Sequence, residues 1–147
     1  WDVDNNWALI YGLDAVARAL QHQRYKDTER GTNLREAGQI MVGGLKKYQS
    51  PRGGWGYYSS STAGWRPDWA TSFTTAAAVA CMFNSGEYET DQVKKMMAYC
   101  EKNVWPGRGV TSRFGHWHYT HYYYSQVMYR MGEEKWGKYS AEITKPC

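Results

Sequence analysis

Residues 49–55 constrain the fold of this chain more than any other segment. Gln49 is followed by three residues and then by Gly53, Gly54 and Trp55, which gives the pattern Gln-x-x-x-Gly-x-Trp. This spacing predicts a junction between two helices, in which Gln49 satisfies unpaired backbone groups at the end of the first helix. The glycines permit a tight turn, and the indole of Trp55 packs over the junction. Because one helical hairpin cannot bury its apolar face alone, the motif predicts an array of hairpins.

Apolar residues recur at helical spacing on both sides of this motif. The spacing predicts a first helix over about 5–22. Asn33 and Glu36 have the separation of a capping box, so we expect a second helix to begin there and to run to about Tyr48. Residues 49–70 are rich in Gly, Ser and aromatic residues and form a long loop in this interpretation.

The second half of the chain predicts four more helices. Thr71 or Ser72 is expected to cap a helix whose body, residues 73–83, lacks a polar face and therefore belongs in the interior. The next helices alternate between outer and inner positions, over about 91–103, 118–131 and 133–143. The sequence therefore predicts one all-α domain, residues 1–147, built from αα-hairpins over about 5–48, 71–103 and 118–145.

Composition limits the classes of partner. The chain has 147 residues, enough for one domain with a real core, and 13 Tyr and 8 Trp raise its aromatic content to 16%. Polar-tipped aromatic residues favour a recognition surface. The net charge of +4 is spread among acidic residues, which is a poor pattern for nucleic-acid binding, and no apolar run is long enough to span a membrane. Because the chain begins at Trp1, we interpret it as a processed product or a piece of a longer protein.

The three cysteines allow at most one internal disulfide. Cys81 and Cys100 fall inside apolar helical patterns, where a buried thiol is expected. Cys147 is the last residue and has three possibilities: a disulfide with Cys100, a disulfide with another chain, or no partner.

Further segments carry a family resemblance. Residues 71–78 read Thr-Ser-Phe-Thr-Thr-Ala-Ala-Ala, and residues 117–124 read Trp-His-Tyr-Thr-His-Tyr-Tyr-Tyr. With the Gln49 to Trp55 motif and the start of the chain, they resemble the prenyltransferase and squalene-oxidase repeat family, and in particular its noncatalytic-looking, uncharacterised bacterial members. The resemblance covers nearly the whole chain, and its Gln-Trp motif is specific for fold rather than for activity.

The resemblance implies an α/α toroid, in which inner helices line a central cavity and outer helices surround them. Toroids of this family usually have six hairpins, whereas this sequence predicts about three. The chain is then either half of a ring that missing sequence or another copy completes, or a short arc that covers its open ends by association.

Two groups of residues are candidates for chemistry. Terpene cyclases of the family use an Asp-x-Asp-Asp acid, and the nearest match here is Asp2 and Asp4, which lacks the final acid and is equally typical of a helix start. His118 and His121 share a helical face, but no nearby cysteine or carboxylate completes a zinc set. We favour hydrogen-bonding or stacking roles for these histidines, with a metal site as the alternative, and expect no cofactor.

The candidate binding residues are aromatic or polar side chains in the long loop and at the expected start of the fifth helix. One interpretation is that most of these aromatic rings fill junctions between hairpins, and the other is a concave pocket or a protein interface. Tyr58, Tyr119, Tyr123 and Tyr124 belong to the same aromatic set. The candidates are Trp55, Tyr57, Trp65, Arg66, Asp68, Trp69, His116, Trp117, His118 and Tyr122.

These observations favour a noncatalytic helical-repeat module that binds a partner or builds a structure, either with copies of itself or with another protein. An oligomer or an extracellular filament subunit is the specific form of this hypothesis, which favours an extracellular or periplasmic location. The alternative is an enzyme that resembles terpene cyclases or prenyltransferases, with Asp2 and Asp4 as acids and aromatic rings that stabilise carbocations on an isoprenoid substrate. Carbohydrate binding through Trp65 and Trp69 is a third possibility.

Overall fold

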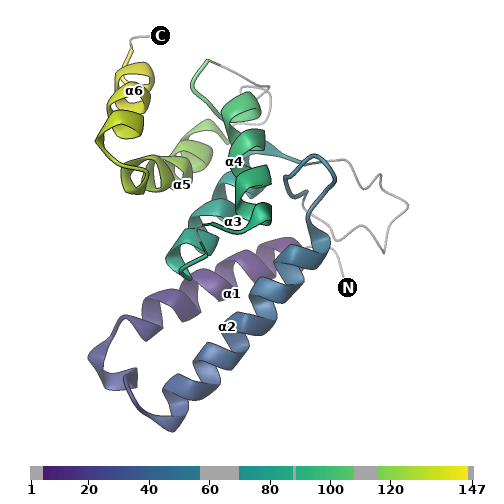
Figure 1. The fold of residues 1–147 in the computed structure, drawn as a ribbon, viewed down its shortest axis with the longest axis vertical. Coiled ribbons are helices and arrows are strands. Elements are labelled where there is room, and N and C mark those ends of the chain that lie inside the picture. Colours follow the sequence, from purple (N-terminus) through teal and green to yellow (C-terminus); the bar gives the residue numbers. More distant parts are fainter. Residues whose placement is uncertain (1–4, 57–69, 88, 108–115, 146–147) are drawn as a thin grey trace.

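The structure, a computed structural model, describes residues 5–56, 70–87, 89–107 and 116–145. Within these ranges all regular structure is helical, which confirms the all-α fold class (Figure 1). None of the helices in these ranges is long and apolar enough to cross a membrane. The elements are α1 (Asn5–Leu20), the 3-10 helix η1 (Gln23–Tyr25), α2 (Glu29–Tyr48), α3 (Ser72–Asn84), α4 (Asp91–Asn103), α5 (Trp117–Arg130) and α6 (Glu133–Ile143).

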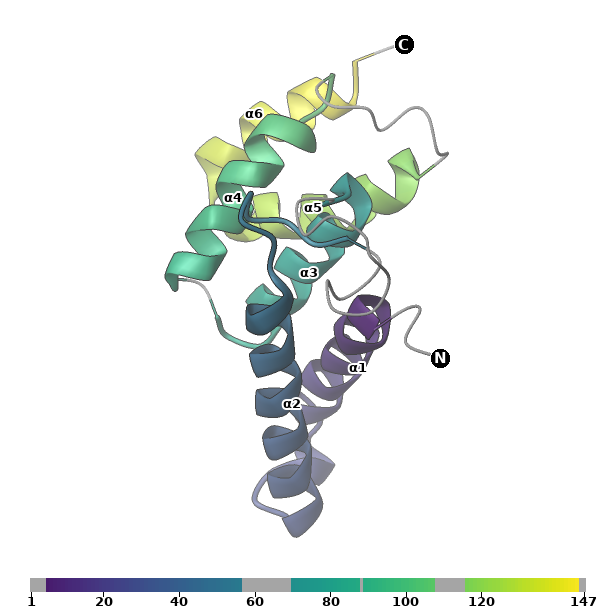
Figure 2. The same ribbon diagram turned by 90° about the vertical axis from the view of Figure 1, so that its right-hand side faces the viewer.

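The helices form three hairpins in a row. Helices α1, α3 and α5 pack side by side with α3 in the middle, and each also packs against the helix that follows it in the chain. The α1–α2 hairpin extends beyond the other two (Figure 2). These contacts follow the expected alternation of inner and outer helices, while a closed ring of hairpins stays a prediction.

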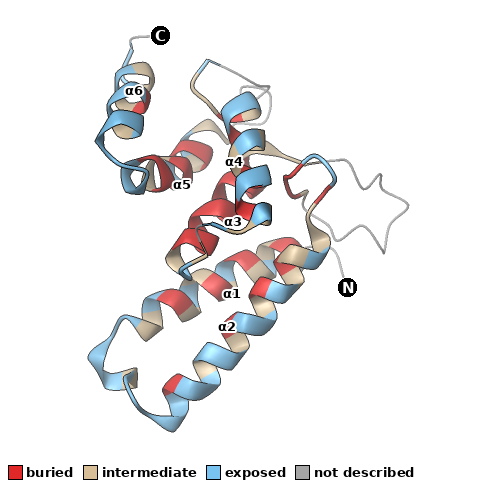
Figure 3. Ribbon diagram, in the orientation of Figure 1, coloured by how far each residue is buried: buried red, intermediate tan, exposed pale blue. Residues whose placement is uncertain are grey.

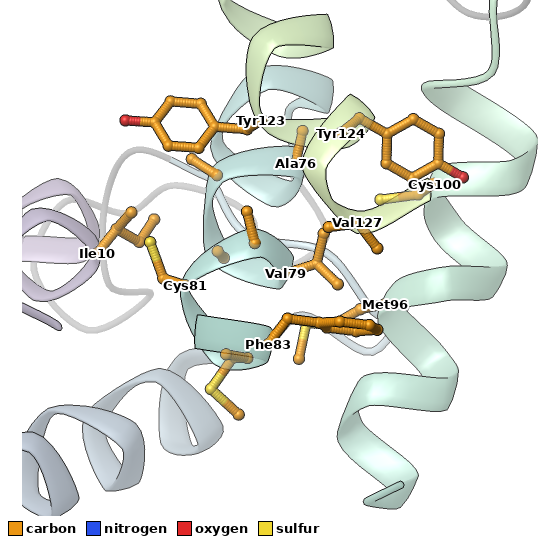
Figure 4. Close-up of a cluster of buried hydrophobic side chains, with 14 of the residues drawn as sticks. Ile10, Ala76, Val79, Cys81, Phe83, Met96, Cys100, Tyr123, Tyr124 and Val127 are labelled. Atoms are coloured by element: carbon orange, nitrogen blue, oxygen red, sulfur yellow. The ribbon is translucent and has the colours of Figure 1, made fainter. Parts of the chain in front are cut away.

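Helix α3 is the centre of the core. Every residue from Phe73 to Phe83 is buried, as the apolar run predicts (Figure 3). Its small side chains let α1 approach on one side, where Ile10 is buried, and α4 and α5 on the other, where Met96 and Val127 are buried (Figure 4). Close packing of these apolar surfaces is the main stabilising term of the fold.

The junction motif joins α2 to α3, as predicted, but Gln49 and Trp55 have different roles from those expected. The indole Nε1 of Trp55 donates a hydrogen bond to the carbonyl oxygen of Leu45 at 2.9 Å. Leu45 lies in the last turn of α2, where carbonyl groups lack partners within the helix. Trp55, rather than Gln49, therefore satisfies the end of this helix.

Gln49 instead connects the junction to α4. Its amide nitrogen donates to the carbonyl oxygens of Gly53, at 2.9 Å, and of Gln92, at 3.1 Å. The backbone N–H of Trp55 donates to the hydroxyl oxygen of Thr75 in α3 at 3.0 Å. One seven-residue segment thus contacts three helices, which explains why its residue types are so specific.

The start of α2 differs from the prediction. The helix begins at Glu29 after the N-cap residue Thr28, whose hydroxyl oxygen accepts a hydrogen bond from the N–H of Gly31 at 3.1 Å. The expected capping box of Asn33 and Glu36 is wrong, because both residues lie inside the helix. The other described helices begin and end within two residues of the expected positions.

Both described cysteines are buried free thiols. Burial raises the pKa of the Cys81 thiol to about 12 and also raises the pKa of the Cys100 thiol. Cys100 faces the core from α4 with Val93 and Met96. Because Cys100 is a free thiol, the Cys100–Cys147 disulfide, one of the three possibilities for Cys147, is not formed in this structure; Cys147 itself lies outside the described residues.

Candidate functional site

The structure describes about half of the candidate site residues. Those that lie outside the described ranges are the acids Asp2 and Asp4 and the loop residues Tyr57, Trp65, Arg66, Asp68 and Trp69. Their roles stay predictions.

Trp55 is a core residue and not a ligand-binding residue. Its side chain is fully buried, and its only polar atom, Nε1, is bonded to Leu45. The binding role expected for Trp55 is corrected accordingly, because no ring surface is open to a ligand. The other interpretation of the aromatic residues, that they fill junctions between hairpins, applies to this residue.

His118 and His121 lie in the first part of α5 but have different environments. His118 is exposed, whereas His121 is buried, and its Nδ1 lies 2.9 Å from the hydroxyl oxygen of Tyr139 in α6. The ring of Trp117 packs against His121 with centroids 4.6 Å apart. The structure thus places His121 in a hydrogen-bonding and stacking role that fixes α6 on α5. Among the residues that the structure describes, no three His, Cys, Asp or Glu side chains form a group that could hold a metal ion.

Burial shifts the pKa of His121, and this shift makes the stability of the protein depend on pH. Desolvation, and secondarily the nearby charge of His118, lowers the pKa of His121 from 6.5 to about 4. The unfolded chain therefore binds more protons than the folded chain between these pH values.

We expect the protein to lose stability as the pH falls from about 6.5 to about 4. The unfolding free energy should decrease by up to about 1.4 kcal/mol per pH unit, or about 3 kcal/mol across the window, because protonation of His121 favours the unfolded chain. Urea denaturation at several pH values measures this slope. His121→Asn should flatten it, whereas His118→Asn, at an exposed position, should keep most of it. An equal slope in wild type and His121→Asn would contradict the assignment.

Aromatic rings from the three inner helices meet on one surface, here called the aromatic face. It begins on α1, where Trp7 stacks on Tyr11 with centroids 5.4 Å apart. Trp7 also stacks on Phe73 of α3 at 5.9 Å and meets the edge of Tyr119 of α5 at 5.4 Å. His116, just before α5, packs on Phe73 at 4.4 Å. The aromatic face consists of Trp7, Tyr11, Phe73, His116, Tyr119, Tyr122 and Tyr123.

Hydroxyl groups connect α1 to α5 across this face. The hydroxyl oxygens of Tyr11 and Tyr119 are 3.0 Å apart. Burial raises the pKa of both Tyr119 and Tyr123, so these phenols stay protonated and can donate hydrogen bonds. Tyr11 and Tyr122 are 48% and 58% exposed, which leaves ring surface open for contact with a partner.

An ion pair borders the aromatic face. Asp14 of α1 accepts hydrogen bonds from Arg18 Nε at 2.8 Å and from Asn84 Nδ2, at the end of α3, at 3.0 Å. The pair with Asp14 raises the pKa of Arg18, and the nearby hydroxyl of Tyr122 adds to this effect. Asp14 therefore links α1 to α3, and Arg18 lies near the exposed ring of Tyr122.

Only part of this face could be inferred from the sequence. His116 and Tyr122 are among the candidate binding residues, and Tyr119 and Tyr123 belong to the expected aromatic set, whereas Trp7, Tyr11 and Phe73 were not expected there. Trp7 and Tyr11 are four residues apart, the spacing that puts two side chains on one helical face, so their place on a common face could be inferred from the sequence. Tyr123 and Tyr124 point to opposite sides of α5 (Figure 4), and Tyr124 is fully buried in the core.

Comparisons with protein-family models, with curated proteins and with solved structures find no match to this chain.

Proposed function

We propose that this chain is a noncatalytic helical-repeat module that acts by associating with copies of itself. The observation that carries the proposal is apolar surface at both ends of the hairpin row. At one end, Tyr129 is 69% exposed and Met131 is 41% exposed. At the other end, Ile40 of α2 is 75% exposed. An open groove with a volume of about 660 Å³ lies between the α1–α2 hairpin and the α3–α4 turn, and it is lined by apolar residues such as Leu13 and Val42 and by polar residues such as Arg35 and Glu87. Outer faces of a repeat array need a polar surface or a neighbour, and the exposed apolar side chains at both ends favour a neighbour.

The polar groups of the inner helices support a role in binding rather than in chemistry. Asp14 is engaged with Arg18 and Asn84, and His121 is engaged with Tyr139. The Asp14–Asn84 and His121–Tyr139 contacts join neighbouring helices and hold them in place. The exposed rings of Tyr11 and Tyr122 offer contact area at a low cost in side-chain entropy, as is common in protein interfaces.

Light scattering on a size-exclusion column, together with negative-stain microscopy, tests the proposal. We expect a mass that is a multiple of the 17.0 kDa chain and that increases with protein concentration. The same mass in the presence of a reductant would show a noncovalent assembly, and a decrease would show that Cys147 links the chains. A monomer over the whole range from micromolar to millimolar concentration would contradict the proposal.

An enzyme that acts on an isoprenoid is the second candidate, and the aromatic face favours it. Open aromatic rings attract cations through their π faces, and this would stabilise a carbocation intermediate. The proposed acids, Asp2 and Asp4, lie outside the described residues. Product formation from squalene or from an isoprenoid diphosphate would support this candidate if it is lost in Asp4→Asn, and no turnover by the intact protein would exclude these substrates.

A further inference from the structure

Helix α6 is attached to the rest of the molecule chiefly through one side chain. All residues of α6 are described, and Tyr139 is the only one of them that is buried. Its hydroxyl oxygen lies 2.9 Å from Nδ1 of His121, and its ring meets the rings of Tyr124 and Trp105 edge to face, with centroids 5.5 and 5.8 Å apart. Helix α6 packs mainly against α5, at one end of the hairpin row (Figure 1). It therefore docks as a small separate element.

A single glycine sets the direction of α6 relative to α5. Helix α5 ends at Arg130 and α6 begins at Glu133, so only Met131 and Gly132 connect them. Met131 has a helical φ of −75°, and its N–H donates to the carbonyl oxygen of Val127 at 3.0 Å, as in a helix. Gly132 has φ +95° and ψ 171°, a conformation that is essentially restricted to glycine. The chain thus leaves the path of α5 at Gly132.

Helical torsions at Gly132, with a small adjustment at Met131, would make one continuous helix over residues 117–143. Glycine adopts helical and positive φ values with similar ease, so both arrangements are open to it. His121 and Tyr139 are 18 residues apart, which is about 27 Å along a straight helix. Tyr139 could then no longer reach His121 of its own chain. The vacated site would fit Tyr139 of a second copy, because the contacts are those seen within one chain.

Exposed apolar side chains flank this hinge. Tyr129 is 69% exposed and Met131 is 41% exposed. The ring of Tyr129 meets the ring of Trp136 across the turn, with centroids 5.7 Å apart. When two copies exchange a terminal helix, their connecting segments pass between the same two molecules and approach each other. Side chains that are exposed beside the hinge in one chain are then covered by the other chain.

We propose that two copies of this chain exchange α6, so that Tyr139 of each copy packs on His121 of the other. This inference rests on the proposed self-association and names its contact. The exchange keeps the contacts of α6 and changes the hinge, so the main term against it is the entropy lost when two chains join. Because the exchange is reciprocal, the assembly has a two-fold axis and closes at two copies.

Two changes at the hinge should shift association in opposite directions. Gly132→Ala disfavours the observed turn through its φ of +95°, and a Cβ atom there would meet nothing within 4 Å among the described residues. We expect it to strengthen dimer formation about tenfold or more. Insertion of Gly-Ser-Gly-Ser after Gly132 lets α6 fold back more easily and interrupts the continuous helix, so it should weaken dimer formation by about the same factor.

Gly137→Ala is the matched control for the hinge variant. Gly137 lies inside α6, where a Cβ atom would also meet nothing within 4 Å among the described residues. Alanine there favours helix α6 equally in the monomer and in the exchanged dimer, so the dimer dissociation constant should stay that of wild type. Light scattering over a range of concentrations measures these constants, after incubation until the mass no longer changes.

A native ion pair reports which chain supplies α6. Lys135 Nζ of α6 lies 3.1 Å from Glu101 Oε1 of α4. A carbodiimide reagent can join this pair as an amide, and the joined peptides are identified by mass spectrometry. In a mixture of ¹⁵N-labelled and unlabelled chains that has been left to exchange, an α6-exchanged dimer gives Lys135–Glu101 peptides in which only one half is labelled. A chain that keeps its own α6 gives only uniformly labelled or unlabelled pairs.

The outcomes separate this inference from the proposed function. If wild type associates but Lys135 and Glu101 are joined only within one chain, the exchange is wrong while self-association stands. If Gly132→Ala associates no more strongly than Gly137→Ala, Gly132 is not the hinge of an exchange and the inference fails. If wild type and Gly132→Ala are both monomers at all concentrations, the proposed function and this inference both fail.

Discussion

Replacing Trp55 with alanine is expected to lower the free energy of unfolding by about 4 kcal/mol, a large part of the stability of a domain of this size. The side chain is fully buried at the point where α2, α3 and the junction loop meet. Its loss would leave a large cavity and would also remove the donor to the Leu45 carbonyl oxygen. Urea denaturation followed by far-UV circular dichroism measures the change without relying on tryptophan fluorescence.

A conservative variant separates the two contributions. Trp55→Phe keeps an aromatic ring but loses the hydrogen bond to Leu45, so we expect a smaller decrease of about 2 kcal/mol. Tyr129→Ala, at an exposed position, should change the unfolding free energy by less than about 0.5 kcal/mol. A cost below about 1 kcal/mol for Trp55→Ala would show that the indole does not hold the junction together.

The helices could be predicted from the sequence where their residues face a core. Residues 73–83 are apolar on all sides, so their interior position could be inferred without any knowledge of neighbours. The amphipathic pattern of α4 likewise gave its bounds, Asp91–Asn103. The start of α2 could not be predicted in the same way. Gly31 is the only buried residue in the first turns of this helix, so the sequence there has no periodic pattern of apolar residues.

The candidate site was harder to predict because it depends on contacts between distant segments. Trp7 and Tyr119 are separated by more than a hundred residues, and only the packing of α1 and α5 against α3 brings their rings together. The two histidines of α5 show that contacts with another helix also decide the environment of residues that are close in sequence. Helical spacing put His118 and His121 on one face, but α6 covers only His121, and the sequence of α5 does not contain that information.

The loop conformation at Gly53 leads to a second prediction of large effect. Gly53 has φ +92°, and a Cβ atom there would overlap the backbone carbonyl group of Lys95 in α4. Gly53→Ala therefore combines an unfavourable backbone conformation with a clash that the side chain cannot avoid. We expect the unfolding free energy to decrease by about 4 kcal/mol in urea denaturation, because the loop must move away from α4.

Gly86 provides a matched control for this variant. It has a similar φ of +87°, but a Cβ atom there would meet nothing within 4 Å. Gly86→Ala should therefore lower the unfolding free energy by about 1 kcal/mol, which is the cost of the unfavourable backbone conformation alone. The difference in unfolding free energy between the two variants measures the cost of the clash between the junction loop and α4. Equal costs would mean that the glycine of the Gln-x-x-x-Gly-x-Trp motif is needed only for its conformation, whereas a larger cost at Gly53 means that the motif needs glycine chiefly for contact with the next hairpin.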